Sequence, residues 1–523
     1  MKIEEHLETT VKAHDQMLHR RVDLLLRTGE LLVESLADTN RIMRNMKRTA
    51  AYLGIPEEKL HINIGFNMLM VNVSDENFSF TKFQRINGHG VNMTAISAVS
   101  KLSWRAIEND YSLDRYEEEL EKIRTEKRNY TPLQTAVGAG FACGGFCVQF
   151  GCDWMAFLYA SIAAIIGMRV RQKCNGSGLN PYMGIAISAF IATMIAWATM
   201  FLPAEWTDTP WHPLLACALF IVPGVPLINF VDDMLDNFIQ VGVVRAVNTL
   251  IMMGAMAFGI AFAVKLCAIE NFFPTISMVP HHAYWEYALA AAISAMGFSM
   301  IFNIQRRLLW VVAIGGILAV CTRNFVNLGP STDNIGLDMG LVVGSFSGAL
   351  LVSLIAVKAV HWFHVPNHVL TIPSVIPMIP GVLMYRMLFG LINMNVQNLE
   401  GVTPLMKAIE SGVNSGLIIL CISVGVAIPN IYQLCRPKEI HQACQSETHP
   451  TIHTVHPNLP LMHNRSDHNP VSSFAQKLSF HPDWQFAFEL ETMQYQYLKY
   501  MQIDYPLRLF QAKRPFYYYH HSY

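Results

Sequence analysis

The sequence reads Ile221-Val-Pro-Gly-Val-Pro-Leu-Ile-Asn-Phe-Val-Asp-Asp-Met-Leu-Asp236 at one point and Ile372-Pro-Ser-Val-Ile-Pro-Met-Ile-Pro-Gly-Val-Leu-Met-Tyr-Arg386 at another. Both stretches are largely apolar, and a Pro-Gly pair interrupts each of them. Proline removes a backbone N–H donor and clashes with the preceding helical turn, so a helix breaks there and its freed carbonyl groups need other partners. The two stretches predict two broken helices at matching positions of the chain.

The sequence around these stretches indicates an internal repeat. The Pro-Gly pair recurs at an offset of 157 residues, and a Gly-Phe pair followed by another phenylalanine recurs at an offset of 152. The matched residues are Pro223-Gly224 with Pro380-Gly381, and Gly145-Phe146 and Phe150 with Gly297-Phe298 and Phe302. We expect a duplicated hydrophobic region with five membrane spans in each half. Because five is odd, the second half would enter the membrane from the opposite side, which gives an inverted repeat.

The composition is that of a membrane protein with a soluble N-terminal part. Hydrophobic side chains make up 52% of the 523 residues and charged ones 15%, against roughly 25% charged in soluble domains. Residues 1–130 hold 19 of the 38 Lys and Arg and 20 of the 39 Asp and Glu. Beyond them, eight charge-free runs come near the roughly 20 residues that cross a bilayer, and two shorter ones are flanked by arginines that can reach the interface. The eight are 129–152, 174–204, 209–231, 246–264, 287–305, 339–357, 359–385 and 411–435, and the two are 154–168 and 308–322.

We therefore predict an α-helical polytopic membrane protein with about ten spans, preceded by a small cytosolic α+β domain. The predicted regions are the α+β domain at 1–130, a first five-helix bundle at 131–270, a second at 281–436, and a mostly disordered cytosolic tail at 437–523. Periodicity within the first region predicts a long amphipathic helix, two strands and two further helices. Their ranges are 18–53, then 61–73 and 78–86, then 92–108 and 113–127.

Charge placement predicts which side of the membrane the loops face. Residues 1–16 are charged and lack the apolar core of a secretory signal, so we expect the N-terminal domain in the cytosol. With ten spans, most of the Lys and Arg in the loops fall on the side of that domain, which agrees with the excess of positive charge in cytosolic loops. We therefore expect a multi-pass protein of the cell membrane with both termini in the cytosol.

Candidate substrate-binding residues surround the first break. Broken helices at matching positions enclose the substrate in many inverted-repeat transporters, which makes Pro223 and Gly224 candidates. Asn229, Asp233 and Asp236 follow at helical positions i, i+4 and i+7, so one helix face presents an amide and two carboxylates that could admit substrate or carry a proton. A structural kink followed by a hydrated acidic cluster is the alternative interpretation.

The second break offers the corresponding candidates, Pro380 and Gly381. Arg386 lies six residues beyond Pro380, roughly 9 Å along a helix, in an otherwise apolar stretch. Its guanidinium can form a bidentate contact with a carboxylate, so Arg386 is a candidate substrate ligand. The alternative is an arginine whose long stem reaches the outer membrane interface.

The N-terminal domain contains one further candidate, the run Arg85-Ile-Asn-Gly-His-Gly90 between a predicted strand and a helix. His89 could act as a general base or anchor a loop, with Arg85 and Gly90 beside it. We find no Ser or Cys nucleophile in a convincing elbow, so a membrane-anchored hydrolase is an alternative that leaves ten spans unexplained. We expect no metal or cofactor site, because no CxxC pair occurs and the nine histidines of the tail are scattered.

On these residues the chain resembles the threonine/serine exporter family, whose bacterial relatives also occur as split two-component exporters implicated in succinate efflux. The resemblance covers residues 18–436. In the N-terminal part it rests on Leu25-Leu-Arg-Thr-Gly-Glu-Leu-Leu32, on Asp38-Thr-Asn-Arg41 and on the run ending at Gly90. In the bundles it rests on Pro223-Gly224, Asn229 and Asp233, and on Pro380-Gly381, Tyr385 and Arg386.

The resemblance implies a secondary transporter that exports a small polar metabolite, driven by the proton gradient and without ATP or another cofactor. Nothing like a phosphate-binding GxxxxGK[ST] loop occurs, and the near-neutral net charge of −1 gives no argument for nucleic-acid binding. The substrate could be an amino acid such as threonine or serine, or a dicarboxylate such as succinate. The expected partners are that substrate, protons and the lipid bilayer, and the sequence leaves a homo-oligomer, a channel and the hydrolase open as alternatives.

Overall fold

The N-terminal part of the chain forms an α+β domain in the computed structural model, which describes residues 2–75, 78–198, 201, 203, 206–269, 282–330, 335–394 and 403–435. Its elements are α1 (Lys2–Glu34), α2 (Thr39–Tyr52), the short 3-10 helix η1 (Glu57–Lys59), β1 (Leu60–Ile64), β2 (Met68–Ser74), β3 (Ser79–Arg85), α3 (Met93–Glu108) and α4 (Leu113–Thr125). The strands form one antiparallel sheet in the order β1-β2-β3. Helices α3 and α4 confirm the predictions at 92–108 and 113–127, and the predicted tail lies outside the described residues.

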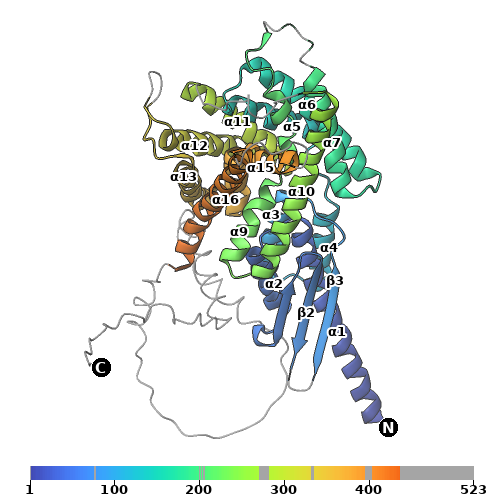
Figure 1. Ribbon diagram of the computed structural model, residues 1–523. Helices are drawn as coiled ribbons and strands as arrows, with labels where there is room; N and C mark the ends of the chain where they lie inside the picture. The colour runs from blue at the N-terminus through green and yellow to red at the C-terminus, as the bar shows by residue number, and fades with distance from the viewer. Residues whose placement is uncertain are drawn as a thin grey trace, which may run out of the picture. The chain divides into compact units, whose positions relative to one another are not determined.

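Helix α1 packs closely on the sheet and on α2 because of a glycine. A Cβ atom at Gly29 would come within 2.5 Å of Leu69 Cδ2 on β2 and 2.6 Å of Met46 Sδ on α2. Larger residues would therefore hold the three elements apart. Figure 1 shows α1 beside the strands.

Residues 61–73 form two strands, so the prediction of one strand there was wrong. Leu60 pairs with Val73 and Ile64 with Leu69, in an antiparallel hairpin. The Gly65 amide donates a 2.8 Å hydrogen bond to the Met68 carbonyl and closes the turn. Apolar alternation continues on both sides of this tight turn, which is why the pattern alone did not reveal it.

The single helix predicted over 18–53 was also wrong. Helix α1 starts at Lys2 and ends at Glu34, and α2 begins only at Thr39. Between them Leu36 adopts a left-handed φ of 60°, and Asp38 caps α2 by accepting a 2.7 Å hydrogen bond from the Arg41 amide. Both helices carry the same apolar periodicity, which conceals the break, whereas Asp38 is a typical N-cap residue. We call residues 35–38 the α1–α2 link.

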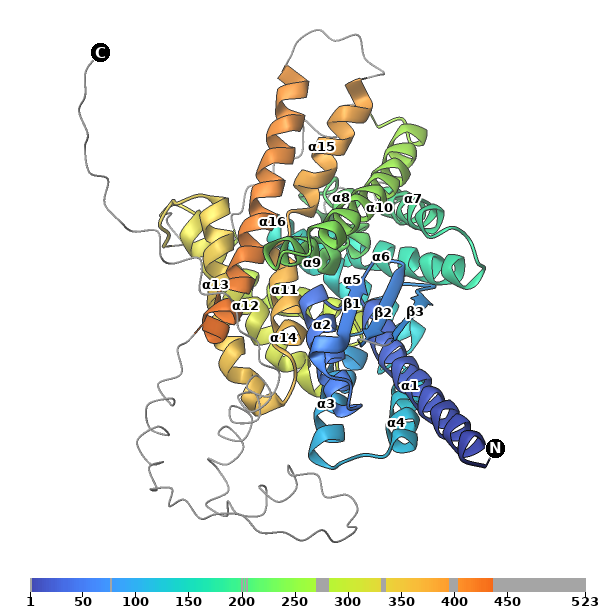
Figure 2. The same ribbon diagram turned by 90° about the horizontal axis from the view of Figure 1, so that it is seen from below.

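The rest of the described chain is helical (Figures 1 and 2). Its first part contains α5 (Pro132–Gln149), α6 (Trp154–Gly176), α7 (Pro181–Ala198), α8 (Pro213–Ala216), η4 (Leu219–Ile221), α9 (Gly224–Leu235) and α10 (Ile239–Leu266). Its second part contains α11 (Tyr284–Ile301), η5 (Arg306–Leu308), α12 (Leu309–Asn327), α13 (Leu341–Phe363), α14 (Asn367–Val375), η6 (Ile376–Met378), α15 (Gly381–Met394) and α16 (Thr403–Cys435).

Six of these helices are long and apolar enough to cross a membrane. They are α6, α7, α10, α12 with η5, α13 and α16. A seventh span results if the segment Asn367–Met378 and the segment Gly381–Gly390, bent by 53° at their junction, are counted as one. The described residues thus provide six or seven candidate spans.

The other three expected spans are helical, but they fall short in length or hydropathy, so a count of ten stays a prediction. The run at 209–231 is divided among α8, η4 and α9, because prolines interrupt it. Helix α5 contains four glycines and two glutamines, and α11 begins with a glutamate in its first turn. Most residues of α5 and eight of the 18 residues of α11 are buried by protein, where small residues that allow close packing are more useful than apolar bulk.

Helices α5 and α11 pack against each other in opposite directions. A Cβ at Gly138, near the start of α5, would lie 3.0 Å from the Gly297 carbonyl oxygen, near the end of α11. A Cβ at Gly145, near the end of α5, would lie 2.6 Å from the Ala290 carbonyl oxygen. The two first helices of the predicted halves therefore run antiparallel in backbone contact.

The N-terminal domain contacts both of these helix ends. The Met93 amide of α3 donates to the Phe302 carbonyl at 3.0 Å, and Thr94 Oγ1 donates to the Asn303 carbonyl, just after α11. The Asn129 amide, just before α5, donates to Asn303 Oδ1 at 2.8 Å. The start of α5 and the end of α11 thus lie on the side of the N-terminal domain.

Candidate functional site

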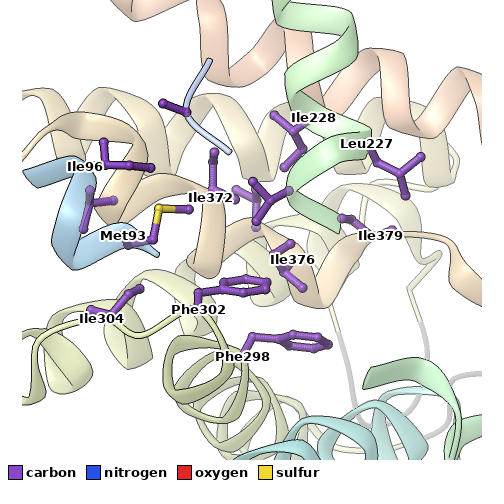
Figure 3. Close-up of a cluster of buried hydrophobic side chains, with 14 of the residues drawn as sticks. Met93, Ile96, Leu227, Ile228, Phe298, Phe302, Ile304, Ile372, Ile376 and Ile379 are labelled. Carbon is purple, nitrogen blue, oxygen red and sulfur yellow. The ribbon is translucent and has the colours of Figure 1, made fainter. Parts of the chain in front are cut away.

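The two Pro-Gly breaks lie against each other, as their matching positions predicted. A Cβ at Gly224 would come 2.3 Å from Ile376 Cδ1, and one at Gly381 would come 2.7 Å from Leu219 Cδ2. Each glycine is therefore in contact with a side chain from the segment just before the other break. Figure 3 shows the row of Ile372, Ile376 and Ile379 between Leu227 and Ile228 on one side and the rings of Phe298 and Phe302 on the other.

A small apolar cavity of about 10 Å³ lies at this contact. Its lining consists of four pairs of residues, each separated by 152 or 157 positions: Phe146 with Phe298, Leu219 with Ile376, Val222 with Ile379, and Gly224 with Gly381. The rings of Phe146 and Phe298 meet edge to face with centroids 5.7 Å apart. Four of the residues on which the repeat was inferred, Phe146, Gly224, Phe298 and Gly381, thus line one cavity, which is too small for an amino acid.

The polar residues after the first break contact the N-terminal domain. Asn229 Nδ2 donates a 2.9 Å hydrogen bond to the Leu36 carbonyl, and Arg245 Nη2 on α10 donates a 2.8 Å bond to the Ala37 carbonyl. Because the backbone turns at Leu36, these two link carbonyls point away from α1 and need external donors. Asn229 and Arg245 therefore fix the α1–α2 link to α9 and α10.

Asp233 takes part in the same contact between the N-terminal domain, α9 and α10. Its Oδ1 accepts a 2.8 Å hydrogen bond from the Thr39 amide, the first residue of α2, and its Oδ2 lies 3.0 Å from Arg245 Nη1. The Asp233 and Arg245 side chains are 1% and 3% exposed. A buried ion pair with additional hydrogen bonds of this kind depends on both partners. Asp236, which is exposed, accepts a 2.7 Å hydrogen bond from Asn40 Nδ2.

A second group of polar side chains lies beside this ion pair. His368 Nδ1 on α14 lies 3.4 Å from Asp38 Oδ2 and 3.8 Å from Asp232 Oδ2. Within the described residues neither carboxylate oxygen of Asp232 has a hydrogen-bond partner, although the residue is 5% exposed. A cavity of about 10 Å³, enough for one water molecule, is lined by residues that include Asp38, Asn229 and His368.

Asp38 itself is held as a carboxylate. Burial raises the pKa of Asp38, but the Arg41 guanidinium, with Nε 3.0 Å from Asp38 Oδ2, lowers it. His368, Arg44 and the hydrogen bond from the Arg41 amide lower the pKa of Asp38 further, and together these groups outweigh burial. The net result is a pKa of Asp38 below its ordinary value. Asp38 is therefore ionised at neutral pH and combines the roles of helix cap and ion-pair partner.

The predicted residues after the second break have a different setting. Tyr385 is fully buried, and Arg386 on the same helix is partly exposed. Asp233 contacts Thr39 on α2 and Arg245 on α10, whereas Arg386 lies on α15. The structure thus brings Pro223, Gly224, Pro380 and Gly381 together, and groups Asn229 and Asp233 with the N-terminal domain.

The N-terminal candidates form a loop anchor. His89 Nε2 lies 3.2 Å from Asn67 Oδ1, and its ring stacks on Phe66 with centroids 4.0 Å apart. Burial lowers the pKa of His89, so the ring is neutral at pH 7. The Gly90 amide donates a 2.8 Å hydrogen bond to the Glu34 carbonyl at the end of α1, and Arg85 is exposed at the end of β3. His89 and Gly90 thus attach the loop after β3 to the β1–β2 turn and to α1.

Four residues of this site were not selected from the sequence: Asp38, Asp232, Arg245 and His368. Asp38 stood in a motif that was used only for the resemblance. Arg245 and His368 carried an available signal, since an ionisable residue beside or within a predicted span marks a functional site by default. Asp232 was missed because the i, i+4, i+7 spacing favoured its neighbour Asp233. Asp38 and His368 lie 330 positions apart, a juxtaposition that local patterns do not reveal.

Two models of known protein families match most of the N-terminal region and of the helical part of the chain. A family model described as "Putative threonine/serine exporter" matches residues 23–267, and one described as "Threonine/Serine exporter, ThrE" matches residues 287–432. The chain belongs to the threonine/serine exporter family. It is therefore a multi-pass protein of a membrane transporter family, which implies a transporter and not an enzyme. The two matches are separated by residues 268–286.

Two curated relatives of this exporter family member are bacterial. "Probable succinate transporter subunit YjjP" of Klebsiella aerogenes is 24% identical over 208 residues, 40% of this chain and 80% of that protein. The protein of the same name from Escherichia coli strain K12 is 23% identical over 248 residues, 47% of this chain and 95% of that protein. No solved structure matches the chain.

Proposed function

We propose that this protein exports a small polar metabolite, such as threonine or serine, by alternating access between two helical halves. The observation that carries the proposal is the reciprocal contact of the two Pro-Gly breaks, with each glycine against the residue preceding the other break. Such a contact between halves can open on one side while it closes on the other. In the arrangement described here the cavity at the breaks holds no room for substrate, which corresponds to a closed state.

We further propose ten spans in two inverted halves, with both termini in the cytosol. The antiparallel contact of α5 and α11 supports this, because equivalent first spans of an inverted repeat cross in opposite directions. The broken spans support it too. The N-terminal domain contacts α9, which follows the first break, and α14, which precedes the second break. Opposite halves of two broken spans reach the same side only if the spans run in opposite directions.

For substrate recognition we propose the region around the breaks, with Arg386 engaging a substrate carboxylate. A guanidinium suits this role because it can bind a carboxylate with two parallel hydrogen bonds. Both threonine and succinate carry such a group. Tyr385, Asn229 and Asp233 belong to the same proposed pathway, with Asp233 on the side of the N-terminal domain.

Transport by the purified protein in proteoliposomes tests this proposal. Vesicles loaded with unlabelled threonine, serine or succinate should take up the labelled compound by exchange, and an imposed pH gradient should drive its accumulation. Arg386→Ala should abolish uptake, while Lys407→Ala, an exposed cation on α16, should not. Equal behaviour of the two variants would contradict the assigned site, and uptake that never exceeds the outside concentration would indicate a channel.

A dicarboxylate is the second candidate substrate class, because the two curated relatives are named as succinate transporter subunits. The exchange assay separates the classes directly. Exchange of succinate but not threonine would assign the dicarboxylate, and the reverse result would assign the amino acid.

A further inference from the structure

Three segments that are distant in sequence meet at one imidazole nitrogen. Asp38 comes from the α1–α2 link, Asp232 from α9 after the first break, and His368 from α14 before the second break. His368 Nδ1 lies 3.4 Å from Asp38 Oδ2 and 3.8 Å from Asp232 Oδ2. The three side chains are 6%, 6% and 13% exposed, respectively. The N-terminal domain and both helical halves thus each contribute one ionisable group to a buried cluster.

The charges of this cluster do not balance without a proton. Arg41 pairs with Asp38 and Arg245 pairs with Asp233, each with N–O distances of 3.0 Å. Asp232 remains, with neither a guanidinium at that distance nor a hydrogen bond to either oxygen among the described residues. Burying an ionised carboxylate without such partners is far more costly than binding a proton. The charged and titratable groups that face the cluster are Asp38, Arg41 and Arg44 on the link and α2, Asp232, Asp233 and Asp236 on α9, Arg245 on α10 and His368 on α14.

We propose that Asp232 and His368 form the proton-binding site of this transporter and that Asp38 orients the imidazole ring of His368 toward Asp232. The proposal deepens the function proposed above and rests on it. In the closed arrangement the pair holds one proton, on a carboxyl oxygen of Asp232 or on Nδ1 of His368. The neighbouring cavity has room for one water molecule, which could pass the proton on.

The origin of the three groups explains how proton binding is linked to movement. When the α1–α2 link and α14 separate from α9, Asp232 becomes hydrated and releases its proton to the water on that side. When they close, Asp232 must bind a proton before it can be buried. By reciprocal linkage, a proton therefore favours the closed state and its loss favours the open one. A substrate that enters from the cytosol would replace the proton, as exchange of the two requires.

Asp232→Asn is the decisive variant, because an amide has the shape of a protonated carboxyl group but cannot release a proton. In proteoliposomes we expect threonine or succinate exchange at equal pH to persist and accumulation driven by a pH gradient to be lost. Infrared spectroscopy of the detergent-solubilised protein should show a carbonyl band of a protonated carboxyl group that disappears in Asp232→Asn. Accumulation and band as in the unchanged protein would overturn the proposal.

If Asp232→Asn does not fold, His368→Gln and Asp232→Glu test the same site. Both should shift the pH midpoint of the infrared band, and Asp232→Glu should retain accumulation. An unchanged midpoint in both variants would overturn the site. Glu410→Gln and His61→Gln, an exposed carboxylate and an exposed histidine, are the matched controls and should behave as the unchanged protein.

Failure of the broader function has a different signature. If the unchanged protein exchanges neither threonine, serine nor succinate, the proposed substrate classes are wrong, whatever Asp232 does. The infrared comparison then still decides the proton site, because it needs no substrate. A band that survives in Asp232→Asn but disappears in Asp233→Asn would assign the proton to the neighbouring carboxylate and overturn this inference.

Discussion

The two Pro-Gly breaks share a backbone conformation but differ in what the following helix contacts. At the first, the amides of residues 222, 224 and 227 bond to the carbonyls of 219, 222 and 223 at 3.1, 2.8 and 2.9 Å. At the second, the amides of 379, 381 and 384 bond to the carbonyls of 376, 379 and 380 at 2.9, 2.8 and 3.2 Å. Yet α9 is fixed to the N-terminal domain through buried polar groups, while α15 carries Tyr385 and Arg386 within the helical part.

This difference separates two roles that the repeat alone makes look equivalent. In the proposed transport cycle, the breaks provide a symmetric contact at which two halves move. The polar residues after the first break connect that movement to the N-terminal domain, and the second half contributes to this connection through His368 on α14. The N-terminal domain is thus positioned to restrain one broken helix more than the other, and the following predictions test that asymmetry.

The largest loss of stability is expected when the Asp233–Arg245 ion pair is broken. Arg245→Ala leaves the buried Asp233 carboxylate without its cation and the Ala37 carbonyl without its donor, which should destabilise the protein by about 3–5 kcal/mol. Thermal unfolding in detergent measures this, and Asp233→Ala added to Arg245→Ala should recover part of the loss. Arg386→Ala on the other broken helix should be milder, because Arg386 is partly exposed. Equal destabilisation by the two single changes would remove the asymmetry.

A smaller effect is expected from the charge of Asp38. Asp38→Asn retains a side chain that can cap α2 but removes the charge facing Arg41 and should cost about 2 kcal/mol at neutral pH. Because the pKa of Asp38 is lowered by folding, its stabilisation is complete above the unfolded pKa of about 4 and is lost as the pH falls through the folded value. The stability difference between the two proteins should stay constant from pH 7 down to about 4 and shrink only in stronger acid. A difference that already vanishes at pH 6 would contradict the Asp38–Arg41 pairing.

The two glycines at the breaks should be equally sensitive to an added side chain. Gly224→Ala and Gly381→Ala each introduce a Cβ against a side-chain methyl group that can shift, so each should destabilise by about 1 kcal/mol. Ile376→Ala should relieve the first change specifically. Gly254→Ala is the control, because nothing lies within 4 Å of its added Cβ, and it should be neutral or slightly stabilising. Clearly unequal losses at the two breaks would show that their backbone similarity is superficial.

The smallest loss of stability is expected at the exposed edge of the contact between the N-terminal domain and α9. Asn40→Ala removes the 2.7 Å hydrogen bond to Asp236, and it should cost less than about 1 kcal/mol because water replaces the lost donor. Chemical unfolding curves with matched slopes measure such a difference. A loss as large as that of Arg245→Ala would mean that this exposed edge, and not the buried ion pair, holds the N-terminal domain to α9.

Sequence reasoning succeeded where the signal was local. The two Pro-Gly pairs break their helices through local backbone chemistry, and the predicted helices at 92–108 and 113–127 needed only periodicity. It failed where two local patterns of the same period adjoin, at the Gly65 turn and the α1–α2 link. It also passed over His368, because an uncharged histidine does not interrupt an apolar run, and it chose Asp233 over Asp232 from spacing alone.

By itself the sequence determined the charged N-terminal α+β region, the apolar helical part, the two Pro-Gly breaks and the family, because composition, periodicity and Pro-Gly pairs act over a few residues. Only the tertiary structure decided that the two breaks lie against each other, that Asn229 and Arg245 bind the α1–α2 link, and that Asp38, Asp232 and His368 share one buried cluster. These outcomes depend on which helix faces meet across hundreds of residues, and on charges whose balance becomes decisive only once they are buried together.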